Sequence, residues 1–143
     1  MWRIQLAKLN FDNRERNAVA AVLDSGWIAM GERVMKFESQ FADFVGESVY
    51  ASATSSGTAA LHLALLAQNV TYGDEVIIPA LTFVADANVA RLVGAKPVLA
   101  DSDSLDNWNV TPESIKDKVS SKTKAVIVVH FAGYPCDMPA IRE

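Results

Sequence analysis

The hydrophobic pattern of this chain changes at Val49, and that change most constrains its fold. After it, short apolar runs typical of strands alternate with stretches of helical periodicity. The apolar runs are residues 49–53, 76–78, 97–100 and 125–129, and the helical stretches are residues 58–68, 83–93 and 112–119. Continuous apolar strands that alternate with helices indicate a largely parallel sheet covered on both faces. The sequence therefore predicts an α/β fold.

Two helices are predicted before that change. Residues 13–23 have helical periodicity and are followed by a stop signal at Gly26. Large apolar residues then recur at helical spacing as far as Gly46, and we expect this stripe to lie in a core. The stripe consists of Val34, Phe37, Phe41 and Phe44. We accordingly divide the chain into an N-terminal helical segment, residues 1–47, and the first part of an α/β domain, residues 48–143.

Composition excludes several classes of protein. The chain has 143 residues, half of them hydrophobic, which is enough for one core. Its net charge is −4 and its charges are interspersed, so no basic patch predicts binding to nucleic acid. No apolar stretch approaches the roughly 20 residues of a membrane span, and residues 1–5 lack the apolar region of a signal peptide. Because Cys136 is the only cysteine, no internal disulfide can form. We expect a cytoplasmic protein that binds neither nucleic acid nor membrane.

The turn between the first predicted strand and the next helix is a candidate anion site. It reads Ser56-Gly57-Thr58-Ala59. The first N–H groups of a helix have no partner inside the helix, and the helix dipole favours negative charge there. Glycine lets a ligand approach the backbone closely, and the hydroxyls add donors. An ordinary serine or threonine cap that binds no ligand would have the same sequence.

Two further candidate residues follow predicted strands. Phe83 comes after the strand at 76–78, and His130 comes after the strand at 125–129. Ligands of doubly wound sheets bind beyond the carboxyl ends of the strands, where the turn at residues 56–59 is also expected. Helix N–H groups would hold a phosphate there, and an aromatic ring would stack on a planar ligand. The three features together predict a site for a planar, phosphorylated aromatic molecule.

Six short motifs in order resemble the N-terminal part of one family, the DegT/DnrJ/EryC1/StrS aminotransferases. The similarity runs from about Leu9 to Ile141. The motifs are residues 31–38, 56–62, 73–77, 82–85, 94–98 and 123–126. This resemblance implies part of the large domain of a fold type I, aspartate-aminotransferase-like enzyme that depends on pyridoxal 5'-phosphate. It implies amino transfer, with glutamate as the expected donor, to a nucleotide-linked keto sugar.

The resemblance also implies roles for particular residues. Gly57, Thr58 and Ala59 match the turn that holds the cofactor phosphate, chiefly through backbone N–H groups. Phe83 matches the aromatic residue that stacks on the pyridine ring. His130 matches a strand end of the family, where a purely structural histidine and a functional one remain alternatives.

Catalysis in the family needs residues that this chain lacks. A lysine forms a Schiff base with the cofactor, and an acidic side chain partners its pyridinium nitrogen. Both lie beyond the family position that matches Glu143, and no lysine of this chain has the catalytic context. We therefore expect an N-terminal fragment with no catalytic residue and no metal site, unable to transaminate by itself. The full-length relative is expected to be an aminotransferase and a homodimer.

Other functions remain as alternatives to amino transfer. A chain with the phosphate turn but no catalytic lysine could be a non-catalytic module that binds a phosphorylated ligand or serves as a partner subunit. Some relatives use the same scaffold for dehydration. A dinucleotide-binding fold is disfavoured because no G-x-G-x-x-G follows the first strand. A serine hydrolase is disfavoured because Ser55 and Ser56 lack the G-x-S-x-G motif.

Overall fold

The computed structural model describes residues 7–143, and the chain divides into two compact units. The first unit ends at Ala53, and the second runs from Thr54 to Glu143. Within the described residues, no helix is both long enough and apolar enough to cross a membrane.

The first unit contains the two predicted helices, α1 (Asn13–Asp24) and α2 (Glu32–Val45). Helix α1 begins with a capping box. The Asp12 side chain accepts a hydrogen bond from the backbone N–H of Arg14 at 2.7 Å, and the Glu15 side chain accepts one from the N–H of Asp12 at 2.8 Å. These bonds satisfy N–H groups that a helix leaves without partners at its start. Both helices are confirmed.

The prediction that the aromatic stripe of α2 lies in a core is wrong for this structure. Phe37, Phe41 and Phe44 are each more than half exposed, and neither α1 nor α2 contains a buried residue. The rings of Phe37 and Phe41 lie next to each other, with centroids 6.1 Å apart. The physical reason is that two helices alone cannot enclose a core within residues 7–53.

The predicted strand at residues 49–53 is also absent from the structure. These residues form an irregular segment in which Tyr50 is almost fully exposed. The backbone N–H of Ala53 donates instead to the Glu38 carboxylate at 2.7 Å. A strand exists only beside a partner that takes its backbone hydrogen bonds, and no described strand pairs with this segment.

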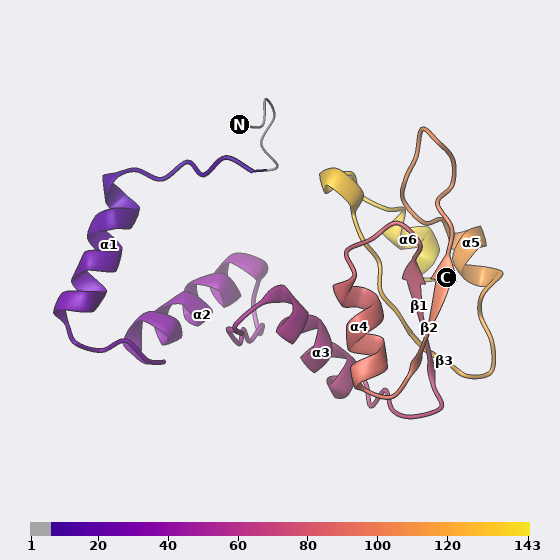
Figure 1. The fold of residues 1–143 in the computed structure, drawn as a ribbon, viewed down its shortest axis with the longest axis horizontal. Helices are drawn as coiled ribbons and strands as arrows, with labels where there is room; N and C mark the ends of the chain where they lie inside the picture. Colours follow the sequence, from indigo (N-terminus) through magenta and orange to yellow (C-terminus); the bar gives the residue numbers. More distant parts are fainter. Residues whose placement is uncertain (1–6) are drawn as a thin grey trace. The chain divides into compact units, whose positions relative to one another are not determined.

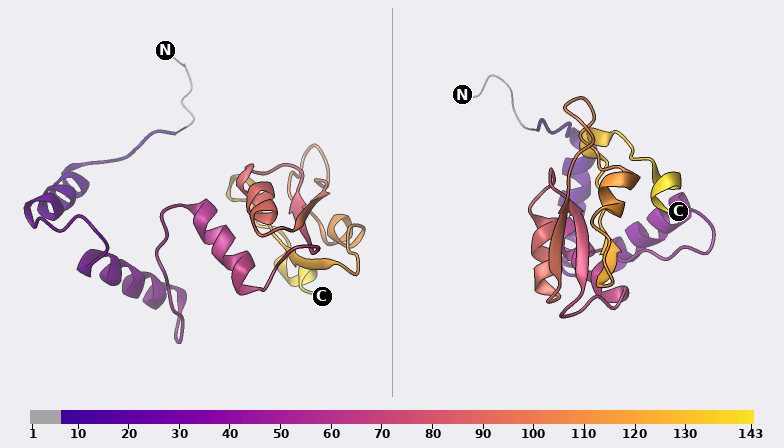
Figure 2. Two further views of the ribbon diagram at one scale, coloured as in Figure 1. Left: turned by 60° about the horizontal axis from the view of Figure 1, so that its bottom comes forward. Right: turned by 90° about the vertical axis from the view of Figure 1, so that its right-hand side faces the viewer.

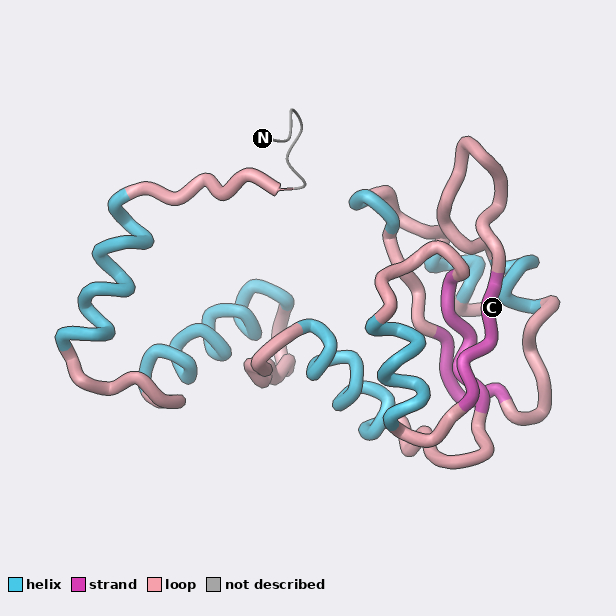
Figure 3. Tube along the Cα trace, viewed as in Figure 1, coloured by secondary structure: helices cyan, strands magenta, loops and turns pink. Residues whose placement is uncertain are grey.

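The second unit is built on a three-stranded parallel sheet (Figure 3). Its strands are β1 (Glu75–Pro79), β2 (Lys96–Ala100) and β3 (Thr123–Val126), in the spatial order β2-β1-β3. Val76 pairs with Pro97 on one side and with Ala125 on the other. Proline lacks the backbone N–H that a central strand donates, and Pro97 lies on an edge strand where this is tolerated. The parallel pairing confirms the predicted fold class.

Helices cover both faces of this sheet (Figures 1 and 2). Four helices and one 3₁₀ turn belong to the unit: α3 (Gly57–Ala67), α4 (Ala85–Leu92), α5 (Pro112–Lys116), η1 (Phe131–Gly133) and α6 (Met138–Ile141). Helices α3 and α4 pack together on one face, and α5 and α6 lie on the other. Helix α5 is shorter than the predicted 112–119, although Thr111 caps it and Pro112 opens it as predicted.

Alternate residues of β1 build two separate cores. Val76 and Ile78 are buried on the face covered by α3 and α4, with Leu65 and Val89. Ile77 is buried on the opposite face, in the core that also contains Ile115 of α5. Side chains alternate across a strand, so a strand that is apolar at every position requires cover on both sides. This confirms the sheet covered on both faces that the sequence predicts.

Candidate functional site

The chain leaves β1 and β3 toward opposite faces of the sheet. After β1 it enters α4 on one face, and after β3 it leads through η1 to α6 on the other face. A crevice opens beyond the carboxyl ends of two neighbouring strands whose connections separate in this way, and ligands of such sheets bind there. The segments at residues 80–83 and 130–133 both come after strand ends, as predicted, although β3 ends at Val126 and not at residue 129.

The turn at Ser56 forms the N-terminus of α3. The Ser56 hydroxyl accepts a hydrogen bond from the backbone N–H of Ala59 at 3.2 Å, so the helix has an ordinary serine cap. The N–H groups of Gly57 and Thr58 donate to no acceptor within residues 7–143. The cap therefore satisfies one donor and leaves two directed outward at the positive end of the helix dipole.

Neither packing nor backbone conformation of this chain requires glycine at position 57. A Cβ atom placed there would meet no atom within 4 Å, and Gly57 is not among the residues with positive φ. This contrasts with Gly94, where φ is +84° and a Cβ atom would lie 3.2 Å from the Cα of Tyr72. The open space at Gly57 suits a phosphate group that approaches the two outward N–H groups closely.

Phe83 lies in the loop between β1 and α4, and its side chain is 74% exposed. Hydrogen bonds fix the loop around it. The Thr82 hydroxyl donates to the Asp86 carboxylate, which is buried, and the N–H of Asp86 donates to the carbonyl of Phe83 at 3.2 Å. An exposed ring on an anchored loop can stack on a planar ligand without a large loss of entropy.

The hydrogen bond between Thr82 and the buried Asp86 is not among the predictions made from the sequence. Its signal was present, since a threonine four residues before an acidic residue at a helix start can form a local hydrogen bond. Because α3 and α4 pack side by side and α3 leads into the amino end of β1, the N-termini of both helices lie toward the carboxyl ends of the strands. The structure thus brings Gly57–Ala59 and Phe83 to the same end of the sheet.

His130 follows β3 at this end, and its Nδ1 has a structural partner. Nδ1 accepts a hydrogen bond from the backbone N–H of Cys136 at 3.1 Å. The Cys136 thiol donates to the carbonyl of Val129 at 3.3 Å, and burial raises the pKa of this thiol. These contacts tie residues 129 and 130 to Cys136 and so fix the position of the His130 ring.

Asn109 was also missed, and it joins the loops that follow β2 and β3. Its side chain is buried, its Nδ2 donates to the carbonyl of Tyr134 at 2.8 Å, and its Oδ1 accepts from the N–H of Phe131 at 2.9 Å. A buried amide with both ends satisfied rigidifies its surroundings. No periodicity or spacing in the sequence indicates this partner 25 residues away.

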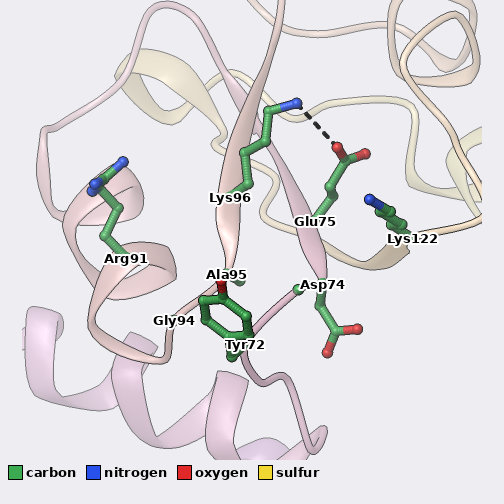
Figure 4. A pocket seen from close by; sticks show the side chains of 9 residues that line it. Tyr72, Asp74, Glu75, Arg91, Gly94, Ala95, Lys96 and Lys122 are labelled. Carbon is green, nitrogen blue, oxygen red and sulfur yellow. Dashed lines mark hydrogen bonds and ion pairs between the residues drawn. The ribbon is translucent and has the colours of Figure 1, made fainter.

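The opposite end of the sheet holds a charged hollow of about 640 Å³ (Figure 4). Its central group is Glu75, whose carboxylate accepts from the Ser120 hydroxyl at 2.7 Å and from Lys96 Nζ at 3.1 Å. These bonds, first that from Ser120 and then that from Lys96, lower the pKa of Glu75. The bonds join the first residues of β1 and β2 to the turn before β3, so the Glu75 carboxylate is satisfied within the chain. Arg91 and Lys122 also line the hollow, and neither belongs to the ion pairs found in residues 7–143.

Comparison with known proteins identifies the family of the chain. Residues 10–143 match the DegT/DnrJ/EryC1/StrS aminotransferase family. The chain belongs to this family. It is 44% identical over 144 residues to the GDP-perosamine synthase of Escherichia coli O157:H7, an alignment that covers 100% of this chain and 39% of that protein.

Two solved structures resemble the chain closely. The PLP form of Spr1654 from Streptococcus pneumoniae, described as a putative sugar aminotransferase, has a TM-score of 0.89 at 30% identity, covering 99% of this chain and 36% of that one. A GDP-4-keto-6-deoxymannose-3-dehydratase with a trapped PLP-glutamate geminal diamine has a TM-score of 0.85 at 32% identity, covering 96% and 37%. The family match confirms the resemblance seen in the six motifs, and the chain spans less than two fifths of each relative.

Proposed function

We propose that a protein carrying this chain transfers an amino group from glutamate to a nucleotide-linked keto sugar with pyridoxal 5'-phosphate as cofactor. The observation that carries this proposal is the first turn of α3, where Gly57 and Thr58 present two outward N–H groups beside open space in a chain of the DegT family. The names of the relatives support the substrate class, since one makes GDP-perosamine and another was trapped with PLP and glutamate.

The residues of the turn fit the phosphate of this cofactor. In this proposal Gly57 and Thr58 donate their N–H groups to phosphate oxygens, and Ala59 contributes through the helix dipole because its own N–H is taken by Ser56. No cationic side chain is needed for such a site, since charge-assisted bonds from backbone N–H groups are strong.

Phe83 orients the cofactor ring in this proposal. Its exposed side chain would stack on the ring face, and the Thr82–Asp86 bond would keep the loop in place while substrates exchange. When bound, pyridoxal phosphate supplies a conjugated ring that accepts electron density during transfer of the amino group. The contribution of this chain is binding and orientation.

We further propose that this chain does not transaminate by itself. All seven of its lysine side chains are exposed to solvent. A lysine that holds such a cofactor covalently works through an amine whose pKa is lowered by burial or by neighbouring cations, and an exposed lysine lacks the burial. The exposed lysines are Lys8, Lys36, Lys96, Lys116, Lys118, Lys122 and Lys124.

Binding of the cofactor can be tested by equilibrium dialysis of the purified chain. We expect pyridoxal phosphate to bind about tenfold or more tightly than pyridoxal, because hydrogen bonds to the phosphate charge are lost without it. Equal retention of the two compounds would contradict the assignment of the turn.

Activity is tested separately, with glutamate and GDP-4-keto-6-deoxymannose as substrates. We expect no 2-oxoglutarate from the chain with added pyridoxal phosphate. The complete relative from Escherichia coli serves as the positive control. Formation of 2-oxoglutarate above the enzyme-free rate would show that a lysine of this chain suffices for catalysis.

A non-catalytic module that binds a phosphorylated ligand or a partner subunit is the second candidate function. The exposure of every lysine favours it over an active enzyme for the isolated chain. An enzyme that holds the cofactor covalently shows an absorbance band in the visible region, and an added amine removes this band. Binding of pyridoxal phosphate without such a band would support the module.

We also propose that the protein is a homodimer. The exposed apolar side chains of Phe37, Phe41 and Phe44 on α2 support association, because contiguous exposed apolar surface is characteristic of interaction sites. Sedimentation equilibrium of the chain should give the mass of a dimer, and the variant Phe41→Ser should shift it toward the monomer. A monomer at all concentrations would refute the proposal for this chain.

A further inference from the structure

A small aromatic hollow lies beyond the carboxyl ends of β2 and β3. Its volume is about 260 Å³, and its walls include Asp106 and Trp108 from the loop after β2 with Phe131 and Tyr134 from the segment after β3. Figure 1 shows both segments at the same end of the sheet. Pockets for whole ligands are typically about 300–1,000 Å³, so this hollow suits one planar ring system.

The aromatic walls are held in place before any ligand binds. The indole Nε1–H of Trp108 donates to the carbonyl of Leu105 at 2.7 Å. The Trp108 and Phe131 rings meet edge to face, with centroids 5.3 Å apart and an angle of 71° between planes. Asn109 joins this loop to Phe131 and Tyr134 by two hydrogen bonds. Because the walls are already ordered, these side chains lose little conformational entropy when a ligand stacks on them.

The only formal charge on the lining is the Asp106 carboxylate. Neither of the ion pairs found in residues 7–143 includes it, and the residue is exposed at the rim. An ionised carboxylate only accepts hydrogen bonds, and it can accept two parallel ones. Guanine presents two adjacent donors on one edge, N1–H and the 2-amino group. Uracil and adenine each place acceptors beside a single donor group, and these acceptors would face the carboxylate.

We propose that this hollow holds the guanine base of the nucleotide-linked substrate, with the base stacked on the aromatic walls and its donor edge on Asp106. The inference rests on the proposed function for its substrate class, and it adds the identity of the base and the residues that select it. Trp108 is a stacking residue, and Asp106 is a specificity-determining residue.

The test uses nucleosides, which carry no phosphate for the turn at Gly57. Guanosine, inosine, adenosine and uridine are titrated into the chain, and the indole N–H signal of Trp108 is followed by NMR. We expect guanosine to bind about tenfold or more tightly than adenosine and uridine, with inosine between, because inosine lacks the 2-amino donor. The variant Trp108→Phe identifies the signal and keeps a ring in the hollow.

Asp106→Asn is the decisive variant, since Asp106 is exposed and its loss should not unfold the chain. We expect it to remove the preference for guanosine, whereas Asp117→Asn, which changes an exposed aspartate outside the hollow, should leave it unchanged. A preference that survives in Asp106→Asn, or wild-type chain without any preference, overturns the proposal.

Binding of pyridoxal phosphate is measured on the same samples to separate the two proposals. Guanosine selectivity without cofactor binding would support the base site and count against the proposed function. Cofactor binding without guanosine selectivity would overturn the base site and leave the proposed function standing.

Discussion

At the amino ends of the three strands, a carboxylate is paired with a lysine and a serine, whereas at the carboxyl ends two backbone donors have no partner within residues 7–143. Glu75 holds Lys96 and Ser120 there within 3.1 Å. At the other end the N–H groups of Gly57 and Thr58 have no recorded partner within residues 7–143. The Glu75 carboxylate in the charged hollow of Figure 4 is thus less available to a ligand than the two N–H groups at the start of α3.

This difference shows why charge alone is a poor guide to function. A cluster of titratable groups that satisfies itself ties strands together, and its removal affects folding. Unsatisfied donors beside exposed rings cost little while water solvates them, and they gain energy only when a ligand arrives. The comparison predicts that substitutions at the amino end change stability alone, whereas those at the carboxyl end can change binding and stability separately.

We expect the largest effect on stability from Thr82→Val, in the loop that follows the carboxyl end of β1. This change removes the hydroxyl that donates to the buried Asp86 and leaves the carboxylate without that donor. We expect the free energy of unfolding in urea at pH 7 to fall by about 1–3 kcal/mol. Thr82→Ser keeps the hydroxyl and should lose much less. A loss in Thr82→Val no larger than that in Thr82→Ser would contradict this expectation, because the hydrogen bond would then contribute no more than the methyl group.

The amino end is tested by Glu75→Gln, with a pH dependence of known sign. The pKa of Glu75 is lowered in the folded chain from its usual 4.5, so its charge stabilises the fold above that value. We expect the variant to melt at a lower temperature than wild type at pH 7. The difference should shrink as the pH falls below 4.5 and vanish below the folded pKa.

Glu47→Gln is the matched control for this variant, because Glu47 is exposed and takes part in neither of the ion pairs in residues 7–143. Its melting temperature should follow wild type at every pH. A difference between Glu75→Gln and wild type that persists unchanged at low pH would rule out the charge as its cause.

The sequence predicts the sheet of the second unit well because the signal there is local. Val76, Ile77 and Ile78 are apolar at every position, which indicates burial on both faces, and the structure places them in two cores. Glycine and proline near the ends of the helices also mark their bounds closely. The turn at Gly57 and the ring at Phe83 are predicted in the same way, from residue type and order, and their roles stay predictions.

The failures have a different physical cause. The strand expected at residues 49–53 and the core expected around Phe41 both depend on a partner, and periodicity does not say whether one is present. Asn109 and Asp86 were missed because a buried polar residue is defined by the groups that satisfy it, and Tyr134 lies 25 residues from Asn109. The local sequence pattern therefore predicts helices and strands better than it predicts which parts of the chain pack on them or hydrogen-bond to their polar groups.

The smallest expected change in stability is the most informative about binding, and it comes from Gly57→Ala. The position has open space and no positive φ, so alanine should fit and raise the free energy of unfolding by about 0.4–1 kcal/mol by restricting the unfolded chain. The added methyl group would occupy the space proposed for the phosphate. Urea denaturation and dialysis against pyridoxal phosphate should therefore move in opposite directions, with tighter folding and weaker binding.

Ser56→Ala is the matched control for that variant. It removes the cap on the Ala59 N–H, which should cost about 1 kcal/mol of stability, and it leaves the N–H groups of Gly57 and Thr58 in place. Pyridoxal phosphate should then still bind to Ser56→Ala, which is less stable, and should not bind to Gly57→Ala, which is more stable. If instead Gly57→Ala binds as wild type does, the open space at the start of α3 is not where the phosphate lies, and the carboxyl end would lose the feature that separates it from the amino end.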